Sequence, residues 1–336
     1  MQPCDMEDEE IDVQPALSSP FLSIQRIIGI MGSKGGVGKS SLTGLLAVEL
    51  ARAGYRVGIL DADLTGSSIP MLFGLHGQLQ AGPYSFLPLQ SESGIKVISA
   101  DLFVDDETQP FVWKSALAGK VIEQLVKEVE WGKLDFLLVD LPPATSEVTV
   151  SILQSIPFTG LVIVTQPQDL SARITSKAVR MAQMLSVSIL GIVENSAYYL
   201  DPNAPERQYL FGPSHLGAYT AFDRLPVLAR LPFSPDFTAL CDQGKIENHA
   251  FAEARILYET FTASLMKIEA EKFVQSQTVN AGIEKEPERL ASVPETGAAF
   301  LQTSHTGEAF SDIVIRLIQN KDNMGSFDHP DAQGLF

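Results

Sequence analysis

Residues 33–41 read Ser-Lys-Gly-Gly-Val-Gly-Lys-Ser-Ser, which are the residue types and spacing of a phosphate-binding loop. Glycines lack a Cβ, so they adopt positive φ and let backbone N–H groups curl around a polyphosphate at a helix N-terminus. In such a loop Lys39 reaches the β and γ phosphates, and the Ser40 hydroxyl ligates Mg²⁺. The residues predicted to bind the nucleotide are Ser33, Gly35, Gly36, Val37, Gly38, Lys39, Ser40 and Ser41. The alternative is a glycine-rich turn that holds no ligand.

Three aspartates follow apolar runs and are candidates for metal and water chemistry. Asp61 and Asp63 come after residues 55–60, and Asp140 ends the run 134–140. Ligands of parallel α/β sheets bind beyond the carboxyl ends of the strands. We therefore expect Asp61 and Asp140 in a magnesium site and Asp63 beside the attacking water. In the alternative interpretation, the Asp61 and Asp63 pair only caps the next short helix.

The elements that must position these groups alternate between apolar strands and helices. Buried strands are predicted at 26–30, 55–60, 95–98, 134–140, 160–168 and 188–195, and helices at 42–50, 111–131 and 171–185. Such an alternation favours right-handed βαβ units, which place helices on both faces of a sheet. We expect an α/β fold with a doubly wound, mostly parallel sheet of about seven strands.

Composition narrows the choice of partners and compartment. The 336 residues are 45% hydrophobic and carry a net charge of −17, which opposes attraction to nucleic acid or to anionic membrane surfaces. No apolar run approaches the roughly 20 residues that span a bilayer. Cys4 and Cys241 are the two cysteines, too few for a disulfide framework. We expect a cytoplasmic protein without nucleic-acid or membrane partners.

The predicted domain organisation is one nucleotide-binding core with appended segments. The first segment, residues 1–22, is acidic and is expected to be a disordered tail. The core is expected at 23–250, a helical insertion and linker at 251–303 with one long helix over 251–273, a terminal helix at 304–320, and a second disordered tail at 321–336.

The loop resembles the deviant phosphate loop of the MinD, ParA and nitrogenase iron protein superfamily, which belongs to the SIMIBI class of P-loop NTPases. The resemblance rests on Lys34, the second lysine of the Lys-Gly-Gly-Val-Gly-Lys-Ser form. In that superfamily this lysine reaches across a dimer interface to the nucleotide of the other subunit. The resemblance therefore implies an ATP-bridged homodimer that hydrolyses ATP slowly, with Lys34, Lys39 and Asp63 in catalytic roles.

Two further segments are similar to the Mrp, Nbp35 and ApbC branch of this superfamily. Residues 140–147, Asp-Leu-Pro-Pro-Ala-Thr-Ser-Glu, resemble its nucleotide switch, although Ala144 and Ser146 replace glycines. Residues 189–195, Ile-Leu-Gly-Ile-Val-Glu-Asn, resemble another conserved stretch of the branch, which implies that Asn195 hydrogen-bonds the adenine edge. The alternative for Asn195 is an asparagine that ends a strand in a turn.

One departure from the branch concerns a metal cluster. Members of the branch carry a Cys-x-x-Cys from which two subunits hold a bridging [4Fe-4S] cluster, but Asp201 and Ala204 occupy those places here. Thiolates hold the iron in such clusters, and alanine has no donor atom. The closest resemblance implies an iron-sulfur cluster carrier or assembly ATPase. The missing thiolates favour a cluster-free ATP switch that acts on a partner protein, and a third hypothesis is a ParA or MinD type positioning ATPase.

Overall fold

The computed structural model describes residues 23–63, 66–77, 79–81, 85–99, 102, 115–201, 203 and 206–282, with backbone only for 80–81, 115–118 and 275–282. The predicted tails at 1–22 and 321–336, most of the linker, the terminal helix at 304–320, Cys4 and Ala204 lie outside these residues.

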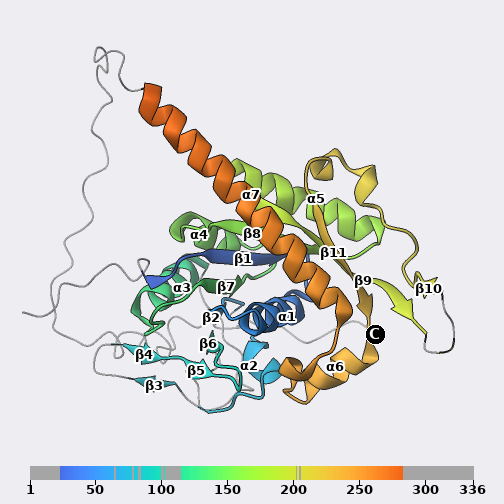
Figure 1. The fold of residues 1–336 in the computed structure, drawn as a ribbon, viewed down its shortest axis with the longest axis horizontal. Coiled ribbons are helices and arrows are strands. Elements are labelled where there is room, and N and C mark those ends of the chain that lie inside the picture. The colour runs from blue at the N-terminus through green and yellow to red at the C-terminus, as the bar shows by residue number, and fades with distance from the viewer. Residues whose placement is uncertain are drawn as a thin grey trace, which may run out of the picture.

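A nine-stranded sheet forms the centre of the molecule, with the strand order β10-β9-β8-β1-β7-β2-β6-β5 and with β11 paired to β9 (Figure 1). Its strands are β1 (Ile27–Gly32), β2 (Val57–Asp61), β5 (Leu89–Gln90), β6 (Lys96–Ser99), β7 (Phe136–Asp140), β8 (Gly160–Thr165), β9 (Ile189–Leu200), β10 (Arg207–Gln208) and β11 (Val227–Phe233). β5 and β10, of two residues each, pair antiparallel, and all the other pairs are parallel. The predicted doubly wound, mostly parallel fold is confirmed, and the two short strands enlarge the sheet beyond about seven.

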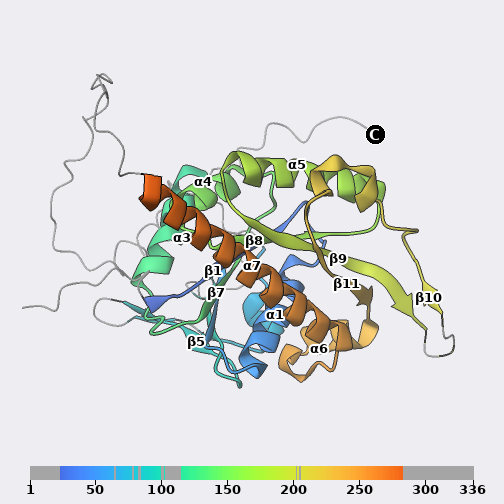
Figure 2. The ribbon, with the colours of Figure 1, turned by 45° about the horizontal axis from the view of Figure 1, so that its top comes forward.

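Helices cover both faces of this sheet, as Figure 2 shows. They are α1 (Lys39–Arg52), α2 (Ile69–Leu72), α3 (Ser115–Glu128), α4 (Glu147–Ser155), α5 (Asp169–Met184), α6 (Pro235–Asp242) and α7 (Ala252–Gly282). A separate two-stranded ribbon joins β3 (Gln80–Ala81) to β4 (Phe86–Leu87). Helices α1, α2, α6 and α7 enclose one apolar cluster, whereas α3, α4 and α5 enclose the other.

The strands are buried on both faces because their sequences are continuously apolar. In β1, Ile28 and Ile30 belong to the cluster beneath α1, while Ile27 and Met31 belong to the opposite cluster. Successive side chains of a strand point to opposite faces, so each face receives every second residue. This arrangement brings the carboxyl ends of β1, β2 and β7 to one edge of the sheet, where the predicted site residues begin.

Helix α7 differs from the expected appended insertion, because its first half packs in the core. Leu257, Phe261 and Leu265 are at most 3% exposed, and the Phe261 ring lies 6.1 Å from that of Phe136. Their spacing of four residues places them on one side of the helix, which covers α1, β9 and β11. The helix also extends past the predicted end at residue 273, to Gly282.

Among the described residues, no helix combines the length and the hydropathy needed to cross a membrane.

Candidate nucleotide-binding site

The loop predicted to hold phosphate joins the end of β1 to the start of α1. Gly38 precedes α1 with φ of 90°, and Gly36 has φ of 76°, a backbone conformation that other residues seldom adopt. A Cβ at Gly36 would meet nothing within 4 Å, whereas one at Gly38 would lie 2.2 Å from Asn195 Nδ2. The loop therefore presents open space on one side of the N-terminus of a 14-residue helix.

Ser33 supports the interpretation of the loop as an anion site. Its side chain is only 1% exposed, and its Oγ has no hydrogen-bond partner among the described residues. A buried polar group without a partner costs free energy, so native proteins seldom keep one. A phosphate oxygen in the loop would supply that partner, which means that the residues present fit a nucleotide.

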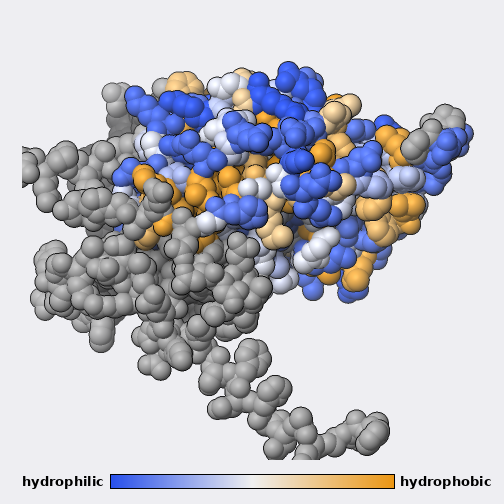
Figure 3. Space-filling model, turned by 90° about the horizontal axis from the view of Figure 1, so that it is seen from below, coloured by the Kyte–Doolittle hydropathy of each residue, from blue (hydrophilic) through white to orange (hydrophobic). Residues whose placement is uncertain are grey.

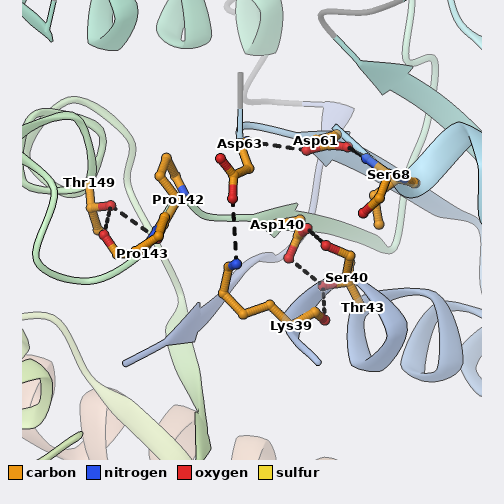
Figure 4. Close-up of polar contacts among 11 residues, drawn as sticks. Lys39, Ser40, Thr43, Asp61, Asp63, Ser68, Asp140, Pro142, Pro143 and Thr149 are labelled. Carbon is orange, nitrogen blue, oxygen red and sulfur yellow. Dashed lines mark hydrogen bonds and ion pairs between the residues drawn. The ribbon is translucent and has the colours of Figure 1, made fainter. Parts of the chain in front are cut away.

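Ser40 and Asp140 are brought together by the first turn of α1 and the end of β7. Ser40 Oγ donates to Asp140 Oδ2 at 2.5 Å, and Thr43 Oγ1 lies 3.0 Å from Asp140 Oδ1 (Figure 4). Burial raises the pKa of Asp140 to about 6, against the lowering effects of the Ser40 hydrogen bond and the Lys39 charge. A hydroxyl and a carboxylate are hard oxygen ligands, and Mg²⁺ takes few of them because it keeps waters and phosphate oxygens. The pair fits a magnesium ion bound together with a nucleotide.

The Asp61 side chain is fully buried, and its hydrogen-bond partners are backbone amides. Its carboxylate accepts hydrogen bonds from the amides of Asp63 at 3.1 Å, Ser68 at 3.0 Å and Ile69 at 3.2 Å. For Asp61 this matches the alternative in which the pair caps the next short helix, here α2, whereas the Asp63 side chain pairs with Lys39 instead. Burial, followed by the neighbouring charge of Asp140, raises the pKa of Asp61 well above its usual value. Strand pairing places Asp61 opposite Asp140.

The two lysines of the loop differ in their surroundings. Lys39 is 7% exposed, and its Nζ lies 3.5 Å from Asp63 Oδ2, toward which it points in Figure 4. Lys34 is half-buried and forms no hydrogen bond or ion pair with the other described residues. Asp63 thus balances the charge of Lys39, whereas the charge of Lys34 is not balanced by another described residue.

A pocket beside the loop contains Asn195. Its walls include Ser41, Leu45, Leu231, Phe233 and Phe237, so it combines a polar rim with apolar and aromatic sides. Asn195 Nδ2 donates to Val37 O at 2.9 Å, which ties the middle of β9 to the loop. Because β9 continues to Leu200, Asn195 does not end a strand in a turn. A flat aromatic base would find hydrophobic walls and one amide here.

Sequence reasoning did not identify Thr43 as part of the site. It lies three residues after Ser40, a spacing that places two hydroxyls on the same side of a helix. That spacing is the only signal in the sequence, because threonine within a helix more often bonds a carbonyl of the preceding turn.

Asp201, which stands where the resembled branch carries a cysteine, forms part of a turn. Asp201 Oδ1 accepts from the Asn203 amide at 2.8 Å and so closes a turn after β9. Leu200, which precedes it, and Tyr209, Leu210 and Phe211, which follow β10, are exposed, and Figure 3 shows hydrophobic residues at the end of the molecule where β10 lies. Cys241 is 8% exposed, and burial raises the pKa of its thiol to about 11. In the described part of the chain, no three His, Cys, Asp or Glu side chains are placed to hold a metal ion.

A glycine loop between a parallel strand and a helix, with a hydroxyl and a strand-end carboxylate beside it, defines the P-loop nucleotide-binding proteins. More narrowly, the chain belongs to the NUBPL iron-transfer P-loop NTPase family of ParA proteins, whose model matches residues 23–266. The matched range extends into α7, in agreement with the packing of the first half of that helix.

Comparisons with individual proteins agree with this family. The chain is 37% identical over 245 residues to the iron-sulfur cluster carrier protein of Clostridium perfringens, covering 70% of this chain and 86% of that protein. For the carrier protein of Aquifex aeolicus the identity is 34%, over 66% of this chain and 61% of the relative. The ADP complex of the nucleotide-binding protein from Archaeoglobus fulgidus matches with a TM-score of 0.61 and 38% identity, covering 68% of this chain and 90% of the other.

Proposed function

We propose that this protein binds ATP with magnesium and hydrolyses it slowly. Lys39 and the amides of residues 33–41 hold the phosphates, Ser40 and Asp140 hold the metal shell, and Asp63 orients the attacking water. Magnesium in this place neutralises charge on the β and γ phosphates. The observation that carries the proposal is the 2.5 Å bond between Ser40 and Asp140 beside the unpartnered Ser33 hydroxyl.

Asn195 supports adenine as the base. Because its Nδ2 donates to Val37 O, its Oδ1 is held on the other side of the amide as an acceptor. Adenine presents an amino group at the position where guanine presents a carbonyl oxygen, so an acceptor favours adenine. Replacement of Asn195 by alanine is expected to weaken ATP binding and to reduce the preference for ATP over GTP.

Lys34 supports a homodimer in which each subunit completes the site of the other. It lies in the phosphate loop and has no hydrogen-bond or ion-pair partner among the described residues. A triphosphate carries several negative charges, which one lysine does not neutralise, and a second ammonium group from another subunit would lower the remaining repulsion.

The test measures binding of a fluorescent ATP analogue and release of phosphate for three variants. Lys39→Ala should weaken binding about 100-fold, because it removes a charge-assisted contact to phosphate. Lys34→Ala should keep nucleotide binding to one subunit but lose turnover and ATP-dependent dimerisation. Lys177→Ala, an exposed lysine of α5, is the control and should match the unaltered protein. Undiminished binding by Lys39→Ala would contradict the nucleotide site.

The cargo of the protein is a separate part of the proposal. Relatives named iron-sulfur cluster carrier proteins support a [4Fe-4S] cluster as cargo. The turn closed by Asp201 and the buried thiol of Cys241 support the second candidate, a cluster-free ATP switch that acts on a partner protein. Anaerobic reconstitution followed by iron and sulfide analysis separates the two. A stoichiometric cluster supports the carrier, and a colourless but active ATPase supports the switch.

A further inference from the structure

Thr43 contacts the metal-site carboxylate from within α1. Its side chain is fully buried, and its Oγ1 lies 3.0 Å from Asp140 Oδ1 and 3.0 Å from the carbonyl oxygen of Lys39. A hydroxyl has one hydrogen, so only one of these two oxygens can receive it at a time. An ionised carboxylate is the stronger acceptor, which favours donation to Asp140.

The two oxygens of Asp140 are thus held by two different hydroxyls. Ser40 occupies Oδ2 and Thr43 occupies Oδ1, and both hydroxyls come from the first two turns of α1 (Figure 4). Two hydrogen bonds on opposite oxygens fix the rotation of a carboxylate about its Cβ–Cγ bond, whereas one bond leaves it free to swing. A metal shell requires ligands within a few tenths of an ångström of their ideal places, because Mg²⁺ demands near-ideal octahedral geometry.

We propose that Thr43 is a positioning residue that holds the Asp140 carboxylate in the orientation in which it and Ser40 receive a magnesium–nucleotide complex. The proposal rests on the proposed function of this site and adds a residue to it. In this arrangement Thr43 would act through Asp140 and would not itself be a ligand of the metal or the nucleotide. Its contribution therefore appears only when magnesium is present.

The experiment compares nucleotide affinity with and without magnesium. A fluorescent ATP analogue is titrated in EDTA and in magnesium chloride, and the ratio of the two dissociation constants measures how strongly the metal favours nucleotide binding. Thr43→Val keeps the shape of the side chain and removes the hydroxyl. It should lower this ratio about tenfold while leaving the affinity in EDTA within about twofold, since one hydrogen bond to a charged group is lost. Thr43→Ser, which restores the hydroxyl, should return the ratio to within about threefold of the unaltered protein.

A double-mutant cycle with Asp140→Asn tests whether the effect passes through that carboxylate. If Thr43 acts by holding Asp140, Thr43→Val should change the magnesium ratio much less in the Asp140→Asn background. Far-UV circular dichroism and thermal melting check that the variants fold. Should Thr43→Val prove unfolded, Thr43→Ala removes the same hydroxyl with less steric demand and is read in the same way.

Two results would overturn the role of Thr43. The first is an unchanged magnesium ratio in Thr43→Val, which includes an equal loss of affinity in EDTA and in magnesium. The second is a failure of Thr43→Ser to rescue the ratio. Neither bears on the proposed function, which fails instead if the unaltered protein binds no nucleotide in either buffer.

Discussion

Lys39 of the phosphate loop and Asp63 beyond β2 form an ion pair, with Nζ 3.5 Å from Oδ2, in a site where both side chains are largely buried. In the proposed function a phosphate group needs the same ammonium group, so Asp63 would compete with nucleotide for Lys39. The Asp63 charge is therefore expected to weaken ATP binding but to support ATP hydrolysis.

Asp63→Asn should bind ATP as tightly as the unaltered protein or up to about tenfold more tightly, because the competing charge on Lys39 is removed. Turnover should fall about 100-fold, because an amide does not orient or activate the attacking water as a carboxylate does. Equilibrium titration and steady-state phosphate release measure the two effects separately. Asp223→Asn, at an exposed position away from the loop, is the control. Weaker binding together with normal turnover would refute both roles.

Gly38→Ala should weaken ATP binding about tenfold, because the new methyl group displaces the Asn195 amide. Gly38 has φ of 90°, and a Cβ there would lie 2.2 Å from Asn195 Nδ2. Gly54→Ala is a matched control, since Gly54 has φ of 91° but nothing within 4 Å of its Cβ position. Both variants should lose about 1 kcal/mol of stability from backbone strain. Only Gly38→Ala should lose affinity, and an equal loss in both would exclude a specific role for Asn195.

His249 should make the protein less stable as the pH falls from 7.5 to 5. Burial, followed by the charge of Arg52, lowers the pKa of His249 to about 4, and its Nε2 lies 3.3 Å from Arg52 Nη1 and 3.5 Å from Glu49 Oε1. The unfolded chain, in which the pKa of histidine is about 6.5, binds more protons in the window between these two values. Stability is therefore present above pH 6.5 and is lost as the pH falls toward 4.

Urea unfolding at pH 7.5 and pH 5 measures this loss. The His249 contribution should decrease by about 2 kcal/mol between the two pH values, and His249→Gln should lack that decrease. His76→Gln, at an exposed position, should keep the pH dependence of the unaltered protein. Identical pH profiles for His249→Gln and the unaltered protein would show that the imidazole is not held neutral.

Phe261→Ala should lower the free energy of unfolding by about 3 to 5 kcal/mol, the usual cost of emptying a buried aromatic site. Phe261 is fully buried between α7 and the sheet, whereas Met266 on the same helix is 64% exposed. Met266→Ala should therefore change stability by no more than about 0.5 kcal/mol. A small effect of Phe261→Ala in urea unfolding would indicate that α7 is an appendage after all.

Several features of the site follow from short-range pattern alone. A glycine loop after an apolar run and before a helix predicts where a phosphate binds, because the geometry of the loop is local. The meeting of Ser40 with Asp140 follows from one further rule, that parallel strands end at a common edge.

Other features depended on contacts between distant segments. The Asp61 carboxylate accepts hydrogen bonds from the amides of Ser68 and Ile69. No sequence pattern distinguishes such a capping carboxylate from a metal ligand, because the contact forms only when the loop after Asp61 has folded. The first half of α7 joins the core because Phe261 packs against Phe136 of β7, more than a hundred residues away in the sequence.

The sequence by itself determined that this chain folds as a parallel α/β protein around a phosphate loop, because strand periodicity and loop chemistry are properties of neighbouring residues. Only the tertiary structure decided the further contacts that complete that site. These are the hydrogen bond of Thr43 to Asp140, the ion pair of Asp63 with Lys39 and the hydrogen bond of Asn195 to Val37. They depend on distances between side chains that are set only when the chain folds.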